Sequence, residues 1–362
     1  MLRNLESIEY MGKKVGILTL HYGINYGGAL QTYATLETLK KLGYDPIIID
    51  RLPNSFSRRY PLRRKFAHPF TQRAFYLFRK HELQPISRPV FTSQEMTELL
   101  KEDYYGVVIG SDQVWRKEVF SVDGDYYLIH QKDLPIKKVA YAASTGVGYW
   151  QYDDSETKEI TDSLNTFSGI SVREAESVPL FKEHCGIDVQ NLLDPTLLAA
   201  PRIYDTLLKK AHLNGVGKLV TYMLDWNSNK ERIVEDVSRR KDLPVQNILP
   251  LIKNRKSIKD RIINQDPTVY DWVNQIATAD FVVTDSFHGM AFSIIFNKQF
   301  IVIGNPERGM ARFTSLLNHF GLADRLTEKN VPNIDENIDY RKVSDLLSIL
   351  REQGINFLKN SL

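Results

Sequence analysis

The chain has 362 residues, 43% hydrophobic and 25% charged, a composition typical of a globular protein large enough for two domains. Its formal net charge of +3 does not favour a nucleic-acid partner, and its single cysteine excludes an intrachain disulfide. The charged start and short apolar stretches predict neither a signal peptide nor a membrane span, so we expect a cytoplasmic protein with at most peripheral membrane contact.

The first half of the chain alternates apolar strand patterns with helical ones. The expected elements are a strand at 14–20, a glycine-rich turn at 21–28, a helix at 29–42, strands at 44–50, 105–110, 138–143 and 169–172, and a helix at 154–165. This order predicts a parallel sheet. Several of these strands run into Gly, Ser, Asp or Arg, as they do where a ligand binds at the carboxyl edge of such a sheet.

The segment 51–90 interrupts this rhythm and reads as a long loop or a loose helical insertion. Within it, Arg58 to Lys80 mixes basic and aromatic residues. Such a stretch could contact an anionic membrane surface or a lipid-linked acceptor. The alternative, which we favour, is a solvated loop that packs a few aromatic rings.

The second half repeats the α/β pattern. Its expected elements are strands at 218–223, 246–251, 280–284 and 299–303, helices at 229–240, 271–279 and 290–296, and a final amphipathic helix at 340–358. We therefore predict an N-terminal domain at 1–190, a C-terminal domain at 191–335, and a helical tail at 336–362 that packs back on the N-terminal domain. A cleft between two such domains is the simplest place for a site.

Two turns of the first half carry candidate ligand contacts. Asn25, Tyr26 and Gly27 stand in the glycine-rich turn, where the backbone can approach a ligand closely, although a tight turn alone would also explain them. Asp112 and Gln113 follow a strand and could bond sugar hydroxyls, or Asp112 could cap a helix. Ser144 ends the next strand and is a further candidate.

Cationic side chains at strand ends suit an anionic substrate. Arg173 ends the strand at 169–172 and could bind a carboxylate or phosphate bidentately, or form a salt bridge to Glu174 or Glu176. Arg308 and Arg312 are further candidates, for which plain surface charge is the alternative.

A strand-to-helix turn at 285–289 can present backbone N–H groups to an anion, which makes Ser286 and Gly289 candidate binding residues. His288 in this turn could act as a general acid or base, or could simply pack the turn. We expect no metal site, because the sequence has neither a Cys pair nor a His-Glu-x-x-His motif.

Six motifs in order resemble the polysaccharide pyruvyl transferase family. They are Asn25-Tyr-Gly-Gly-Ala-Leu-Gln31, Gly110-Ser-Asp-Gln-Val-Trp115, Tyr141-Ala-Ala-Ser144, Ser171-Val-Arg-Glu174, Asp194-Pro-Thr196 and Thr284-Asp-Ser-Phe-His-Gly289. The resemblance implies two Rossmann-like domains as in GT-B glycosyltransferases, and phosphoenolpyruvate as the donor, with no other cofactor. It also implies a cell-surface polysaccharide sugar as acceptor, either lipid-linked or nucleotide-linked, and a cyclic pyruvate ketal as product.

By the same resemblance, His288 matches the site histidine and Arg173 an arginine that holds the donor. Some members carry an arginine where this chain has Ser286, so Arg308, Arg312 or the helix start would have to supply the charge. A nucleotide-sugar glycosyltransferase and a non-catalytic sugar-binding relative are the alternative functions.

Overall fold

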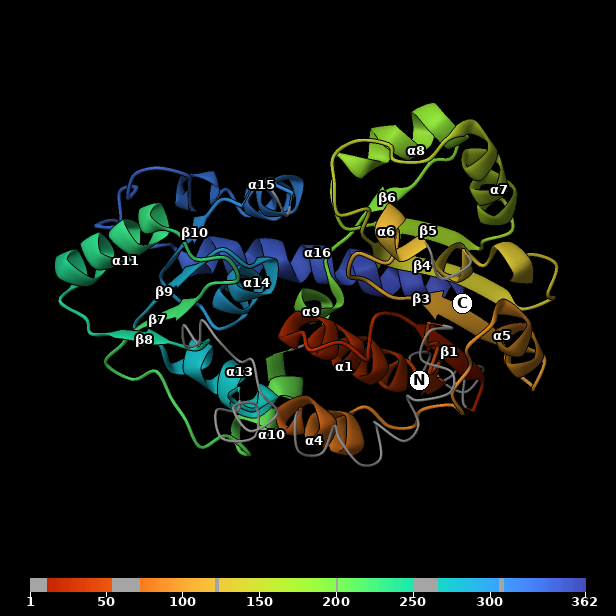
Figure 1. Cartoon of the computed structure of the whole chain (residues 1–362), viewed down its shortest axis with the longest axis horizontal. Helices are drawn as coiled ribbons and strands as arrows, with labels where there is room; N and C mark the ends of the chain where they lie inside the picture. The colour runs from red at the N-terminus through yellow and green to blue at the C-terminus, as the bar shows by residue number, and fades with distance from the viewer. Residues whose placement is uncertain (1–11, 54–71, 121–123, 200, 250–265, 306–308) are drawn as a thin grey trace, which may run out of the picture. The chain divides into compact units, whose positions relative to one another are not determined.

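The computed structural model describes residues 12–53, 72–120, 124–199, 201–249, 266–305 and 309–362. Within these residues the protein is α/β, and its strands form two sheets in which every pairing is parallel (Figure 1).

The first sheet has six strands in the order β2-β1-β3-β4-β5-β6. The strands are β1 (Lys14–Leu18), β2 (Asp45–Ile48), β3 (Gly106–Ile109), β4 (Lys137–Ala143), β5 (Gly169–Val172) and β6 (Gln190–Asn191). The helices of this half are α1 (Tyr26–Lys41), α4 (Arg73–Glu82), α5 (Ser93–Leu100), α6 (Lys117–Phe120), α7 (Asp154–Leu164), α8 (Ser177–Cys185) and α9 (Pro195–Leu198). Strand β3 is buried along its whole length, as expected for a parallel strand covered on both faces.

The second sheet has five strands in the order β11-β10-β9-β7-β8. The strands are β7 (Leu219–Tyr222), β8 (Val245–Asn247), β9 (Phe281–Thr284), β10 (Phe300–Ile303) and β11 (Leu326–Thr327). The helices are α10 (Asp205–Leu208), α11 (Ser228–Lys241), α13 (Val269–Thr278), α14 (Phe287–Ile295), α15 (Ala311–His319) and α16 (Tyr340–Ser361). Val283 and Ile301 lie in the buried core of this half.

Contacts divide the chain into two units. The first holds the described N-terminal segment with residues 79–199 and 350–362, and the second holds 72–78 with the described part of 200–349. Residues 191–199, which we had assigned to the C-terminal domain, group with the first unit, because α9 packs against α1. Helix α16 belongs to both units, changing from the second to the first at Leu350.

Three predicted segments differ from the structure. Helix α1 begins at Tyr26, so the glycines expected in a turn lie in its first turn, where the Asn25 side chain accepts a hydrogen bond from Gly27 N. The strand expected at 246–251 is β8, which begins at Val245 and ends at Asn247, while 250–251 lie outside the described residues. The described end of the 51–90 insertion is largely the helix α4, which buries Phe75 and Phe78, while 54–71 lie outside the described residues.

Candidate active site

Both sheets share one strand order, in which the second strand lies on one side of the first and the third strand on the other. The chain therefore reverses direction across the sheet between β1 and β3, and again between β7 and β9. Ligands of open parallel sheets bind at the carboxyl ends of such strand pairs. The predicted residues follow these strands or their neighbours, so each unit carries its own set of candidate groups.

The start of α1 follows β1. Asn25 caps this helix through its hydrogen bond with Gly27 N at 2.9 Å, while Tyr26 is buried. Gly28 allows a close approach, because a Cβ atom there would lie 3.0 Å from Leu20 O and 3.3 Å from Asp112 Oδ2. The carboxylate of Asp112 thus lies against the first turn of α1, where the helix dipole favours negative charge.

The loop after β3 holds Asp112 in the left-handed region, at φ 71°. A residue other than glycine is uncommon there, and such conformations cluster at functional sites. Asp112 Oδ1 accepts a hydrogen bond from Gln113 N at 3.0 Å, and Gln113 Oε1 accepts one from Arg116 at 3.2 Å. Backbone bonds from Ser144 N to Asp112 O and from Trp115 N to Ser144 O tie this loop to the end of β4.

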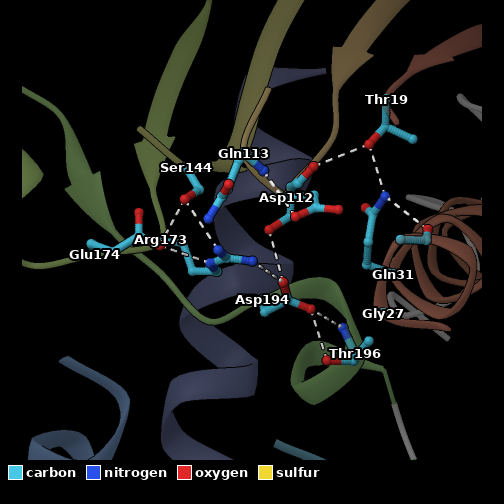
Figure 2. A network of polar contacts seen from close by, with 12 residues as sticks. Thr19, Gly27, Gln31, Asp112, Gln113, Ser144, Arg173, Glu174, Asp194 and Thr196 are labelled. Atoms are coloured by element: carbon cyan, nitrogen blue, oxygen red, sulfur yellow. Dashed lines mark hydrogen bonds and ion pairs between the residues drawn. The ribbon is translucent and has the colours of Figure 1, made fainter. Parts of the chain in front are cut away.

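Arg173 is the centre of a buried polar network at the carboxyl edge of the first sheet (Figure 2). Its Nε donates to Glu174 Oε1 at 2.9 Å, and its two terminal nitrogens donate to Asp194 Oδ2 at 3.2 Å and to Ser144 Oγ at 3.1 Å. Ser144 Oγ also donates to Glu174 Oε1 at 2.8 Å. The alternative to ligand binding by Arg173 was a salt bridge to Glu174 or Glu176, and the salt bridge to Glu174 is present.

Charge at this network is dominated by carboxylates. Burial alone would lower the pKa of Arg173, but Glu174, Asp194 and Asp112 outweigh it and hold the pKa above its usual value. With only 6% of its surface exposed, Arg173 is a cation already balanced by its neighbours. Its donor-binding role stays a prediction, and a donor anion would have to compete with these carboxylates for the guanidinium.

Asp194 connects the network to the rest of the edge. Its Oδ1 caps α9 by accepting bonds from Thr196 N and Oγ1, and its Oδ2 accepts one from Ser111 Oγ at 2.8 Å. The carbonyl of Ser111 accepts a bond from Thr19 Oγ1, which in turn accepts one from Gln31 Nε2 (Figure 2). Side chains that follow β1, β3, β4, β5 and β6 are thus fixed to one another.

In the second unit, the turn after β9 starts α14. Ser286 is its N-cap and accepts a long hydrogen bond of 3.5 Å from Gly289 N. Gly289 also has a packing role, because a Cβ atom there would lie 2.3 Å from Thr284 Oγ1. His288, the second residue of the helix, is 7% exposed and its ring meets that of Phe287 edge-on at 5.1 Å.

Asp285 and Lys230 form a buried ion pair beside this turn that we did not single out from the sequence. Lys230 Nζ lies 2.7 Å from Asp285 Oδ2, and the same carboxylate accepts bonds from the backbone N–H groups of Leu224 and Asp225. The pair ties the turn after β9 to the turn after β7. The sequence signal was the cap Asn227, which places Lys230 in the first turn of α11.

Arg312 is the second residue of α15, which follows β10. Since β10 pairs with β9, Arg312 and His288 occupy the same position in helices that follow neighbouring strands. Arg312 is buried, unlike a plain surface charge. Arg308, the other predicted arginine, lies outside the described residues.

The described residues contain no group of three His, Cys, Asp or Glu side chains that could hold a metal ion. None of the helices described is both long and apolar enough to cross a membrane.

Comparison with known proteins places the chain by family and by fold. The profile of the polysaccharide pyruvyl transferase family matches residues 25–307, whereas no curated protein sequence matches the chain. Among solved structures, the UDP-N-acetylglucosamine 2-epimerase of Rickettsia bellii is similar with a TM-score of 0.53 and 12% identity over 96% of each chain. The UDP-GlcNAc 2-epimerase of Methanocaldococcus jannaschii gives 0.50 and 11% over 94% of this chain and 92% of its own.

These likenesses concern the fold alone. Together with the two parallel sheets they confirm an α/β protein with two Rossmann-like domains, similar to the GT-B glycosyltransferases. The predicted interdomain cleft stays a prediction. Since the family profile spans well over half of the sequence, the chain belongs to the polysaccharide pyruvyl transferase family.

Proposed function

We propose that this protein transfers the pyruvyl group of phosphoenolpyruvate to a sugar of a cell-surface polysaccharide or its precursor. Family membership supports the transferase activity. The observation that carries the proposal further is the position of His288, a buried histidine in the first turn of α14, on an edge that also holds the buried cation Arg312. A histidine on the same sheet edge as a cation suits an anionic donor that must exchange protons.

We assign the donor to the carboxyl edge of the second sheet. Phosphoenolpyruvate carries a carboxylate and a phosphate, and the first turns of α14 and α15 both present backbone N–H groups and a positive dipole end there. Arg312 adds a full charge, and Ser286 a hydroxyl. Arg312 can thus supply the charge that other members take from an arginine at the position of Ser286.

The reaction balances with two sugar hydroxyls and one donor molecule. Addition of the first hydroxyl across the enol double bond places its oxygen on C2 and a proton on C3. The second hydroxyl then displaces phosphate from C2, and the phosphate leaves with that hydroxyl's proton. His288 moves a proton in one of these steps, a contribution of about 10²–10⁴-fold.

We assign the acceptor to the carboxyl edge of the first sheet. Asp112 and Gln113 offer hydrogen-bonding groups beside the start of α1, with Asn25 and Gly27 on the helix side. Ser144 and Tyr26 are predicted contacts whose side chains are buried, so their part is to shape the loops.

We propose a cytoplasmic reaction, because phosphoenolpyruvate is an intracellular metabolite. A lipid-linked acceptor would bring the reaction to the inner face of the membrane.

The test measures phosphate release from phosphoenolpyruvate with a panel of sugars, for the wild type, His288→Ala and His81→Ala. We expect His288→Ala to lose activity by about 10²–10⁴-fold and the exposed His81 variant to keep it. Normal turnover by His288→Ala would remove this residue from the mechanism.

Thermal shift with phosphoenolpyruvate and with UDP-sugars identifies the donor independently of turnover. A shift with phosphoenolpyruvate alone supports the proposal. A shift only with UDP-sugars would favour a nucleotide-sugar glycosyltransferase. Binding of sugars without binding of either donor would favour a non-catalytic relative.

A further inference from the structure

The first unit exposes two large apolar side chains among its described residues, Ile24 at 57% and Tyr149 at 62%. Ile24 lies in the loop after β1 and Tyr149 in the loop after β4. Because the strand order is β1-β3-β4, these loops flank the loop after β3 that carries Asp112 and Gln113. Single exposed apolar residues are ordinary in proteins. Two of them in the loops on either side of the Asp112–Gln113 loop indicate a surface that contacts a ligand.

Trp150, the residue after Tyr149, anchors the loop that carries Tyr149. The indole Nε1 donates to Thr157 Oγ1 at 2.8 Å, and the ring stacks on His184 with centroids 5.2 Å apart and an interplanar angle of 9°. The indole also meets the Phe181 ring edge-on at 5.2 Å. Tyr149 is therefore an exposed ring on an anchored loop, which costs little conformational entropy when a ligand binds.

The same loop lies directly against the predicted acceptor residues. Gly146 has φ +75°, and a Cβ atom there would lie 3.0 Å from Gln113 Cδ and 3.1 Å from Arg116 Cδ. Polar groups that both donate and accept hydrogen bonds thus adjoin the loop that carries an exposed aromatic ring. A sugar ring has matching surfaces, with an apolar C–H face and hydroxyls at its rim, whereas a lipid chain would leave the polar groups unpaired.

We propose that Tyr149 is the stacking platform for a pyranose ring of the acceptor, with Ile24 as a second apolar contact across the Asp112–Gln113 loop. This inference rests on the proposed function for the identity of the acceptor, and it adds the residue that selects a pyranose. Tyr149 acts by binding the acceptor and takes no part in proton transfer.

The test titrates a panel of methyl pyranosides and follows ligand proton signals by saturation-transfer NMR, with Tyr149→Ala, Tyr149→Phe and the control Val216→Ala, which is 65% exposed in the second unit. We expect Tyr149→Ala to weaken sugar binding about tenfold, as for loss of one aromatic stacking contact, and Tyr149→Phe to retain it. The side chain is 62% exposed, so melting temperatures should stay unchanged.

The outcomes separate this inference from the proposed function. The platform is overturned if Tyr149→Ala and the wild type bind sugars with equal affinity. It is also overturned if the wild type binds no pyranoside, even if phosphoenolpyruvate is consumed. Tyr149-dependent sugar binding without phosphate release from phosphoenolpyruvate supports the platform and counts against pyruvyl transfer. A rise in the acceptor KM of Tyr149→Ala at unchanged KM for phosphoenolpyruvate supports both.

Discussion

Arg173 shows at the scale of one residue why a motif does not fix a role. A strand-end arginine suits a donor carboxylate, yet this one is buried among Glu174, Asp194 and Ser144. Its partners follow β4, β5 and β6, so their convergence depends on the strand order, which the sequence motif does not contain.

We predict that Arg173→Ala lowers the free energy of unfolding by about 3–5 kcal/mol, because two buried carboxylates lose their cation. Urea denaturation measures this. The control is Arg88→Ala, which like its partner Glu102 is about half exposed and whose loss should cost about 0–1 kcal/mol.

Equal losses in the two variants would show that the buried network contributes little to stability. The expected loss of stability also affects any test of donor binding that uses Arg173→Ala. A thermal shift that vanishes in Arg173→Ala does not identify a donor contact unless Arg173→Lys, which keeps the charge, is compared at the same protein stability.

At the scale of elements, the sequence predicted most strands, because each is a short apolar run ending in polar residues. It could not predict that Lys230 pairs with Asp285, since the turns after β7 and β9 are adjacent only through the order of the second sheet. It also assigned Gly289 to binding alone, because the neighbour that requires a glycine lies in the preceding strand.

We predict that Gly289→Ala destabilises the protein by about 1–3 kcal/mol. Alanine in a helix is intrinsically better than glycine by about 1 kcal/mol, but its Cβ would lie 2.3 Å from Thr284 Oγ1, so overpacking outweighs propensity. Thermal unfolding measures the change, with Gly23→Ala as the control, where no atom lies within 4 Å of the added Cβ. A stabilised Gly289→Ala would mean that α14 does not pack so tightly on β9.

At the scale of the whole molecule, two helices take part in both units, α4 and the longer α16. The second-unit part of α16 exposes Ile349, whereas its first-unit part buries Phe357. The carbonyl of Leu362, just after the helix, accepts a hydrogen bond from the Tyr105 hydroxyl. Helical amphipathicity predicted the helix. The position where the helix needs a glycine was not predictable: Gly354 lies within α16, and a Cβ atom there would lie 2.5 Å from the Tyr141 hydroxyl.

We predict that Phe357→Ala lowers the free energy of unfolding by about 3–5 kcal/mol, whereas Ile349→Ala on the same helix changes it by less than about 0.5 kcal/mol. Phe357 is 7% exposed and its ring lies 6.1 Å from that of Tyr141 on β4, while Ile349 is 57% exposed. Urea denaturation of both variants measures the difference. Equal losses would mean that the end of α16 contributes no more to stability than its exposed face, and the grouping of Leu350–Leu362 with the first unit would then have no energetic meaning.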